Sequence, residues 1–127
     1  MKRLITLVVL SMICITANAE WVLLARSAEG DNYYADPATK TQTGNVVRMW
    51  AMADNAKPLV AGGKTTNSSR LYAQYDCDER SSHILQTTAF SGKMLRGGVV
   101  ASDPAPAAKE FVAPDTAAET LLNFACK

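Results

Sequence analysis

The sequence predicts an α+β fold: a single domain with an antiparallel β-sheet of about six strands and a C-terminal α-helix packed on it and tied by a disulfide. Three observations support this prediction. Short runs of alternating apolar and polar residues, separated by turn residues, occupy most of residues 21–100. A helical apolar stripe appears at residues 116–126. Two cysteines, Cys77 and Cys126, lie beyond the N-terminal targeting segment described below and can pair with each other.

The first residues form a targeting segment. Lys2 and Arg3 give a short basic region, an apolar run follows, and Ala17-Asn18-Ala19 is a small-x-small cleavage site. We therefore predict a signal peptide at residues 1–19, cleaved after Ala19, and a periplasmic or secreted, outer-surface protein made of residues 20–127. The apolar run is too short to span a bilayer, so no transmembrane anchor is expected.

An alternative interpretation of this segment is that it directs the lipidation of Cys14. That modification requires a small residue immediately before the cysteine, and Ile13 is not small. Cleavage also removes Cys14, which leaves Cys77 and Cys126 as the one intramolecular pair in an oxidising compartment. Closing a loop of about 50 residues would stabilise the fold by roughly 4 kcal/mol on the chain-entropy model. A redox-active or metal-binding pair would need closer spacing, such as C-x-x-C.

Length and charge limit the classes of function. Residues 20–127 suffice for one domain. Loss of Lys2 and Arg3 leaves 11 basic residues against 12 acidic ones. A chain so nearly neutral offers no basic field for nucleic acid or for an anionic membrane surface, and neither partner is predicted.

The first three strands are expected at residues 21–27, 33–36 and 46–53. Trp21, Leu23 and Ala25 should share one face of the first strand. The third strand is apolar on both faces, which is typical of a central strand. We expect a helix to cover one of its faces and a loop or a second subunit to cover the other.

A hairpin should follow, with strands at residues 71–77 and 83–90 around a polar turn, and with Leu71, Ala73, Tyr75 and Cys77 on one face. The connections around it are expected to be irregular. These are a polar, mobile connection at residues 54–69, a flexible turn at 91–98 leading to a short strand at 99–100, and an irregular crossover at 101–114.

Thr116 and Glu119 have the spacing of a capping box at the start of the terminal helix. Ala118, Leu121, Leu122 and Ala125 then form its apolar stripe. Cys126 is adjacent to this stripe, so helix packing and the disulfide should point to the same sheet.

The chain resembles the surface-adhesin protein E-like family of exported Gram-negative proteins over nearly all of residues 20–127. The matching residues are Trp21-Val22, Tyr33-Tyr34-Ala35-Asp36, Val46-Val47-Arg48-Met49-Trp50, Leu71-Tyr72-Ala73-Gln74-Tyr75-Asp76-Cys77, Phe90-Ser91-Gly92 and Cys126. The resemblance implies an antiparallel sheet with a disulfide-fastened terminal helix, and it leaves a homodimer open. It also implies adhesin-like binding of a host-matrix or envelope protein.

The sequence contains only weak matches to motifs for nucleotide binding, metal binding or catalysis. Gly62-Gly63-Lys64-Thr65 resembles the end of a phosphate-binding loop, but Pro58 stands where that motif needs glycine. His83 with Asp76, Asp78 and Glu79 offers metal-binding residue types in a spacing that matches no metal motif. His83 is the one histidine, and no serine lies in a nucleophile motif. No catalytic residue, cofactor or metal is predicted, and the chain is not expected to be an enzyme.

The remaining prediction is a non-catalytic binding module that works through exposed loops. Lys64 lies in the first of these loops, at residues 55–69, and Lys93 and Arg96 lie in the second, at residues 92–98. Tyr34 is a further candidate because adjacent strand residues point to opposite faces, so Tyr33 and Tyr34 cannot both be buried on one side. Two alternatives stay open: a small periplasmic inhibitor of a lytic or proteolytic enzyme, and an envelope structural subunit.

Overall fold

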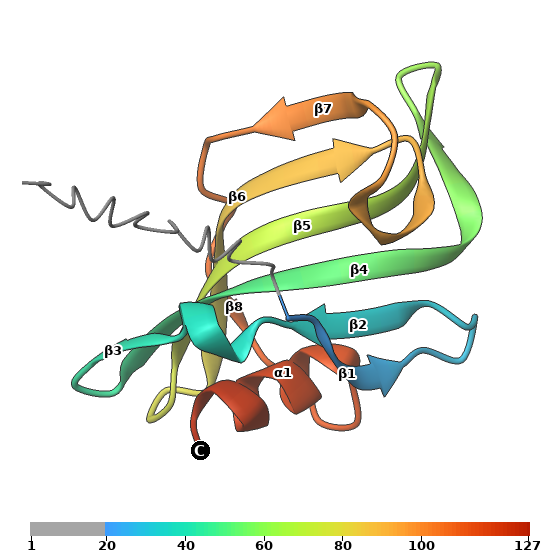
Figure 1. Ribbon diagram of the computed structural model, residues 1–127. Coiled ribbons are helices and arrows are strands. Elements are labelled where there is room, and N and C mark those ends of the chain that lie inside the picture. The colour runs from blue at the N-terminus through green and yellow to red at the C-terminus, as the bar shows by residue number, and fades with distance from the viewer. Residues whose placement is uncertain (1–19) are drawn as a thin grey trace, which may run out of the picture.

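The computed structural model describes residues 20–127, and the predicted signal peptide lies outside the described residues. The described chain forms one curved antiparallel sheet with a helix across one face (Figure 1). The main strand order is β1-β2-β4-β5-β6-β7, and β3 and β8 add to β4 and β6. The strands are β1 Val22–Arg26, β2 Asn32–Ala35, β3 Thr41–Thr43, β4 Val46–Ala61, β5 Lys64–Asp76, β6 Ser81–Phe90, β7 Val99–Asp103 and β8 Glu110–Phe111. The predicted fold class is confirmed.

The two longest strands, β4 and β5, correct the sequence prediction for residues 54–69. This stretch is not a mobile connection: both strands run through it, and they meet at the turn formed by Gly62 and Gly63. Both glycines have positive φ, +58° and +75°, which a tight hairpin turn requires. The hydroxyl-rich sequence suggested a loop, but its side chains bond to neighbouring strands. Thr66 Oγ1, for example, donates to the carbonyl of Phe90 over 2.9 Å.

Two further predictions need correction. The crossover at residues 101–114 is not wholly irregular, because β7 extends to Asp103 and β8 pairs with the start of β6. In β1, a bulge places Leu23 opposite Tyr34 but Ala25 opposite Tyr33. Leu23 and Ala25 therefore lie on opposite faces rather than on one, because the extra residue of a bulge reverses the alternation.

The terminal helix α1, Ala117–Ala125, starts as predicted at Thr116, whose Oγ1 accepts from the Glu119 N–H over 3.2 Å. The reciprocal bond of the capping box is shifted by one residue, because Glu119 Oε1 accepts from the N–H of Asp115 at 3.3 Å. No helix within residues 20–127 is long and apolar enough to cross a membrane.

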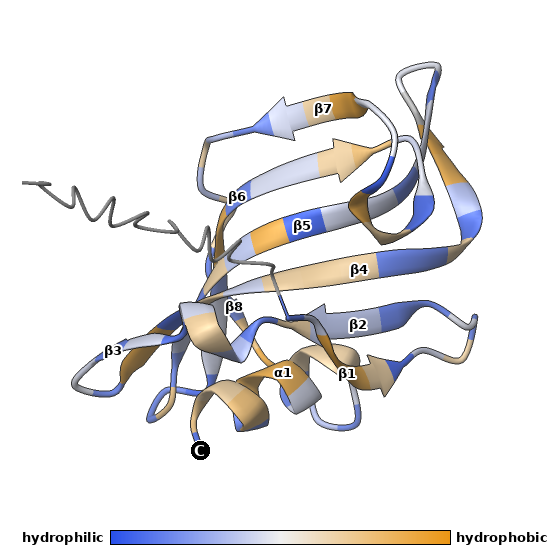
Figure 2. Cartoon of the chain, viewed as in Figure 1, coloured by the Kyte–Doolittle hydropathy of each residue, from blue (hydrophilic) through white to orange (hydrophobic). Residues whose placement is uncertain are grey.

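The core lies between α1 and the sheet, where the helix contributes Leu121, Leu122 and Ala125, all buried. The hydropathy colouring shows that α1 and the middle of β4 are mostly apolar (Figure 2). Facing the helix are Ala35, Val47, Met49, Ala51, Ala73 and Tyr75, from β2, β4 and β5. Three of these six residues are alanines, so the helix can pack closely against the strands.

Two contacts hold the C-terminal end of α1. The disulfide joins Cys77, just after β5, to Cys126, as predicted. Lys40 Nζ donates to the carbonyls of Phe124 at 3.3 Å and Lys127 at 3.2 Å. The last turn of α1 has no basic residue of its own, so Lys40 supplies the positive charge that a helix C-terminus favours, worth about 0.3–1 kcal/mol.

Candidate binding face

The strand register assigns alternate residues of β4, β5 and β6 to the side of the sheet away from α1, which we call the helix-free face. Four cross-strand rungs make up this face. They are Arg48–Gln74–His83, Trp50–Tyr72–Gln86, Met52–Arg70–Thr88 and Asp54–Ser68–Phe90. The β4 residues of these rungs form the second face of that strand. The sequence predicted that this central strand is covered on both faces.

Aromatic and arginine side chains gather across the middle of the helix-free face. The Trp50 and Tyr72 rings have centroids 5.0 Å apart. Arg70 Cζ lies 5.4 Å from the centre of the Trp50 ring and 5.6 Å from that of Phe90. Both distances are in the cation–π range. We call Trp50, Tyr72, Arg70 and Phe90 the aromatic–arginine row.

The Arg70 guanidinium keeps its hydrogen-bond donors available. Its side chain is exposed, and within residues 20–127 it makes neither an ion pair nor a side-chain hydrogen bond. Arg48, one rung beyond Trp50, is bonded through Nε to Gln74 Oε1 at 2.9 Å. The helix-free face therefore presents one arginine held by aromatic rings and another oriented by an amide.

Two shallow depressions flank the stacked Trp50–Tyr72 pair. The smaller, of about 250 Å³, is lined by Trp21, Asp36, Thr39, Trp50, Arg70 and Leu95. The larger, of about 460 Å³, is lined by Thr41, Thr43, Val46, Arg48, Tyr72 and Gln74. The smaller depression is largely apolar, whereas the larger one is polar and apolar in equal parts, so the face offers two different environments side by side.

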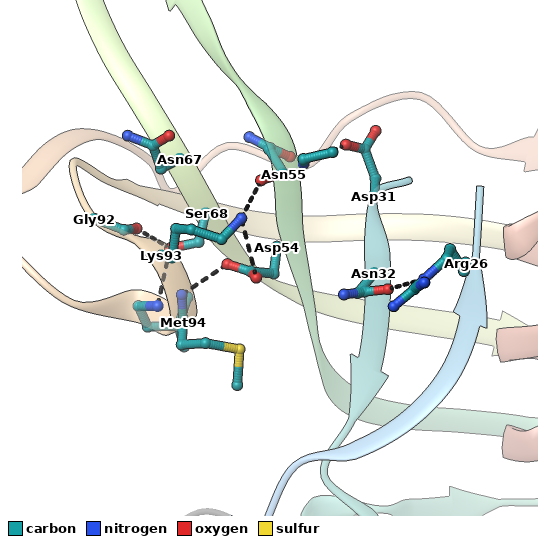
Figure 3. A network of polar contacts seen from close by, with 12 residues as sticks. Arg26, Asp31, Asn32, Asp54, Asn55, Asn67, Ser68, Gly92, Lys93 and Met94 are labelled. Carbon is teal, nitrogen blue, oxygen red and sulfur yellow. Dashed lines mark hydrogen bonds and ion pairs between the residues drawn. The ribbon is translucent and has the colours of Figure 1, made fainter. Parts of the chain in front are cut away.

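A loop at residues 91–98, which we call the clip, covers one end of the helix-free face (Figure 3). Asp54 Oδ1 accepts from the N–H of Met94 at 2.7 Å, and Lys93 Nζ lies 3.5 Å from Asp54 Oδ2. Lys93 Nζ also donates to the Asn55 carbonyl, and Ser68 Oγ accepts from the N–H of Leu95 at 2.9 Å. These bonds bury Asp54 and Ser68 beneath the clip.

The clip holds a strained backbone. Met94 and Leu95 have φ of 54° and 62°, a left-handed conformation that costs a residue other than glycine roughly 1–2 kcal/mol. The bonds from Asp54 and Ser68 to these two residues offset that cost. Because Leu95 also lines the smaller depression, the polar contacts fix one wall of the candidate site.

The predicted loop residues lie in different surroundings. Tyr34 is on the helix-free face, opposite Met52, whereas Tyr33 pairs with Ala53 on the helix side, so the predicted division of the two tyrosines is confirmed. Lys93 is anchored within the clip, and Arg96 follows on its exposed surface. Lys64 is at the end of the β4–β5 hairpin, where Nζ donates to the Val100 carbonyl at 3.3 Å.

The aromatic–arginine row was not predicted from the sequence. One aromatic residue of β5, Tyr75, is 3% exposed and belongs to the core, so residue type alone does not indicate which aromatic side chains form the face. The available signal was the period-two spacing of Arg48 with Trp50 and of Arg70 with Tyr72. That spacing puts each pair on one face of its strand, but the pairing of the two strands was needed to join them.

The acidic turn between β5 and β6 has a structural role. Asp76 Oδ1 accepts from the N–H groups of Asp78 and Glu79, at 3.1 and 2.9 Å. The Lys109 ammonium donates to Glu79, and this bond, with a second one from Ser81, lowers the pKa of the Glu79 carboxyl. Within residues 20–127, no group of three side chains is arranged to hold a metal ion.

Helix α1 leaves a cavity of about 390 Å³ on its own side of the sheet. The lining includes Tyr33, Leu71, Ile84 and Leu121. Burial raises the pKa of the Tyr33 phenol, and the nearby carboxylates of Asp31 and Glu29 raise it further. This cavity is an incompletely filled part of the helix–sheet interface, since it lies directly beside buried core residues.

Comparison with solved structures finds the same fold in Haemophilus influenzae protein E. Crystal form II of that protein aligns with a TM-score of 0.68 at 16% identity, covering 86% of this chain and 88% of that one. Protein E from non-typeable Haemophilus influenzae aligns with a TM-score of 0.61 at 17% identity, covering 88% and 78%. No curated protein matches the chain.

The sequence of residues 21–127 matches the family described as surface-adhesin protein E. The match spans the whole sheet and α1, including both disulfide cysteines. Membership in an adhesin family implies an exported protein that binds host proteins. The chain belongs to the surface-adhesin protein E family and is a non-catalytic binding protein.

Proposed function

We propose that residues 20–127, released by cleavage after Ala19, form an adhesin-type module that binds a host-matrix or envelope protein through the helix-free face. The observation that carries the proposal is the aromatic–arginine row, in which half-buried aromatic rings surround an exposed arginine on the sheet. Tryptophan, tyrosine and arginine are the residue types most often found at the energetic centre of protein interfaces.

The surroundings of the row support the same function. The central strands β4 and β5 are rigidly paired, so the row is held in place before a partner arrives, which lowers the entropic cost of binding. The two depressions offer room for partner side chains on either side of Trp50 and Tyr72. Tyr34 and Arg96 then lie at the rim of the interface, Lys64 is a more distant rim candidate, and Lys93 contributes by holding the clip.

The test uses oxidised protein comprising residues 20–127 and a panel of immobilised extracellular-matrix proteins, with binding measured by surface plasmon resonance. For a matrix protein that is bound, we expect Trp50→Ala and Tyr72→Ala each to weaken affinity at least about tenfold, as for residues at the centre of an interface. Phe111→Ala is the matched control, because Phe111 is 74% exposed on β8, outside the row.

Two results would contradict the proposal. One is unchanged affinity in both row variants, and the other is an equal loss in the Phe111→Ala control. Near-ultraviolet circular dichroism of each variant verifies that a loss of binding does not reflect unfolding. Absence of binding to any matrix or purified envelope protein would reject the adhesin-type function for this chain.

A further inference from the structure

We propose that Arg70 is a carboxylate-binding residue, which receives the side-chain carboxylate of an aspartate or glutamate in an extended segment of the partner protein. The inference rests on the proposed function, since it assigns the chemistry of the partner at the same face. It names an acidic residue with an apolar one two positions away as the feature that is bound.

The first argument is the state of the guanidinium. Every ion pair found within residues 20–127 involves another cation: Arg80, Lys93 or Lys109. Arg70 is instead held by the Trp50 and Phe90 rings, at 5.4 and 5.6 Å from their centroids. Ring contacts leave the edge of a guanidinium free, and its N–H groups match the two oxygens of a carboxylate.

The second argument is the state of the neighbouring acids, which leave the charge of Arg70 unneutralised. Asp36 lines the same depression, but it is buried and its Oδ1 accepts from the N–H of Ala38 at 3.1 Å. Asp54, one rung further along the face, is occupied by Met94 and Lys93. A partner carboxylate would therefore meet a cation with no competing anion in contact.

The third argument is the composition of the depression beside Arg70. Trp21, Trp50 and Leu95 make its walls mostly apolar, and its volume of about 250 Å³ suits one aliphatic side chain. Such a pocket next to a lone arginine fits an apolar residue two positions from an acidic one, because these two residues of an extended segment point to the same side. A sulfated polysaccharide would instead need a dense group of cations, and this chain is nearly neutral.

The spacing of the two arginines on the face gives the length of the bound segment. Arg48 lies opposite Gln74, four residues along β5 from Arg70. Four strand residues extend over about 13 Å. An extended peptide that lies along β5 would therefore bring a second acidic residue to Arg48 if it stands four positions from the first.

The test is an NMR titration of labelled, oxidised residues 20–127 with a blocked pentapeptide that has glutamate at both ends and leucine at the central position, so that all three side chains point to the same side of the extended peptide. We expect shifts at the Arg70 side-chain N–H and the Trp50 indole N–H, and binding that weakens as salt is raised. Arg70→Lys should weaken binding at least about fivefold although it keeps the charge, because lysine lacks the planar fork. Arg26→Lys, on exposed β1, is the matched control and should bind normally.

Several outcomes would overturn the inference: equal binding of a peptide with glutamines in place of both glutamates, normal binding by Arg70→Lys, or preferential binding of a sulfated oligosaccharide at Arg70. The titration contains no matrix protein, so its failure is separable from failure of the proposed function. If the peptide does not bind but a matrix protein still binds and depends on Trp50, only this inference is rejected. Peptide binding without any protein ligand would reject the proposed function alone.

Discussion

The two faces of the same sheet are built for different purposes. Toward α1, strands β4 and β5 present small or aliphatic side chains that are almost completely buried, such as Met49 and Ala73. Away from α1, the alternate residues of those strands include Trp50 and Tyr72, which are partly accessible, and Arg70, which is exposed, although Met52 opposite Arg70 is buried. Because side chains alternate along a strand, one pair of strands supplies both a core and a binding surface. Changes on the first face should reduce stability, and changes on the second should reduce binding.

The largest expected effect is on the helix side, at the disulfide. Cys126→Ser removes a bond that links residues 49 positions apart, and the chain-entropy relation gives a loss of about 4 kcal/mol in the free energy of unfolding. Urea denaturation of the oxidised protein and the variant measures it. Hydrogen exchange at β4 and β5 should show that the helix-free face persists. Equal stability of the two proteins would show that the bond does not constrain the fold.

The next prediction compares the loss of stability caused by one substitution on each face. Leu122→Ala removes a side chain that is 0% exposed and should cost about 3 kcal/mol of unfolding free energy. Trp50→Ala removes a larger side chain from the helix-free face, yet it should cost only about 1 kcal/mol, since this ring is partly solvated. Denaturation curves of both variants test the contrast, and similar losses would mean that both faces belong to one core.

A smaller effect should appear at alkaline pH. Burial raises the pKa of the Tyr75 phenol to about 12, against 10.0 for an ordinary tyrosine. Between these values the unfolded chain releases a proton that the folded chain keeps, so stability falls as pH rises, by of order 2 kcal/mol in total. Below pH 10 this contribution is fully present. Tyr75→Phe should flatten the pH dependence of unfolding, and an unchanged slope would assign it elsewhere, for instance to Tyr33.

A comparably small change in stability is expected at the clip. Asp54→Ala removes the acceptor for the Met94 N–H and the partner of Lys93, which should cost about 1–2 kcal/mol. Faster hydrogen exchange should be confined to residues 91–98 and the adjacent strand ends. Binding at the helix-free face should also weaken, because Leu95 no longer has a fixed position. Unaltered exchange in the clip would mean that other contacts hold its left-handed residues.

The sequence by itself determined the fold class, the terminal helix and the covalent pair. The stripe of Leu121, Leu122 and Ala125 is a local pattern of one helix, and alternation around Ala73 and Tyr75 is a local pattern of one strand. The cysteine pairing followed from counting, because two cysteines lie outside the predicted signal peptide. The first two inferences use residues that are close in the sequence. The third uses the fact that two cysteines can form only one pair.

The tertiary structure alone decided which strands extend through polar sequence and which side chains meet across the sheet. Residues 54–69 have the composition of a loop, but β4 and β5 pair on both sides of an irregularity between Asp54 and Leu59, which makes the stretch a hairpin. A bulge in β1 reversed the faces assigned from simple alternation. Trp50, Arg70 and Phe90 come from three strands, and the register that joins them depends on contacts between residues about 20 positions apart, which no local periodicity records.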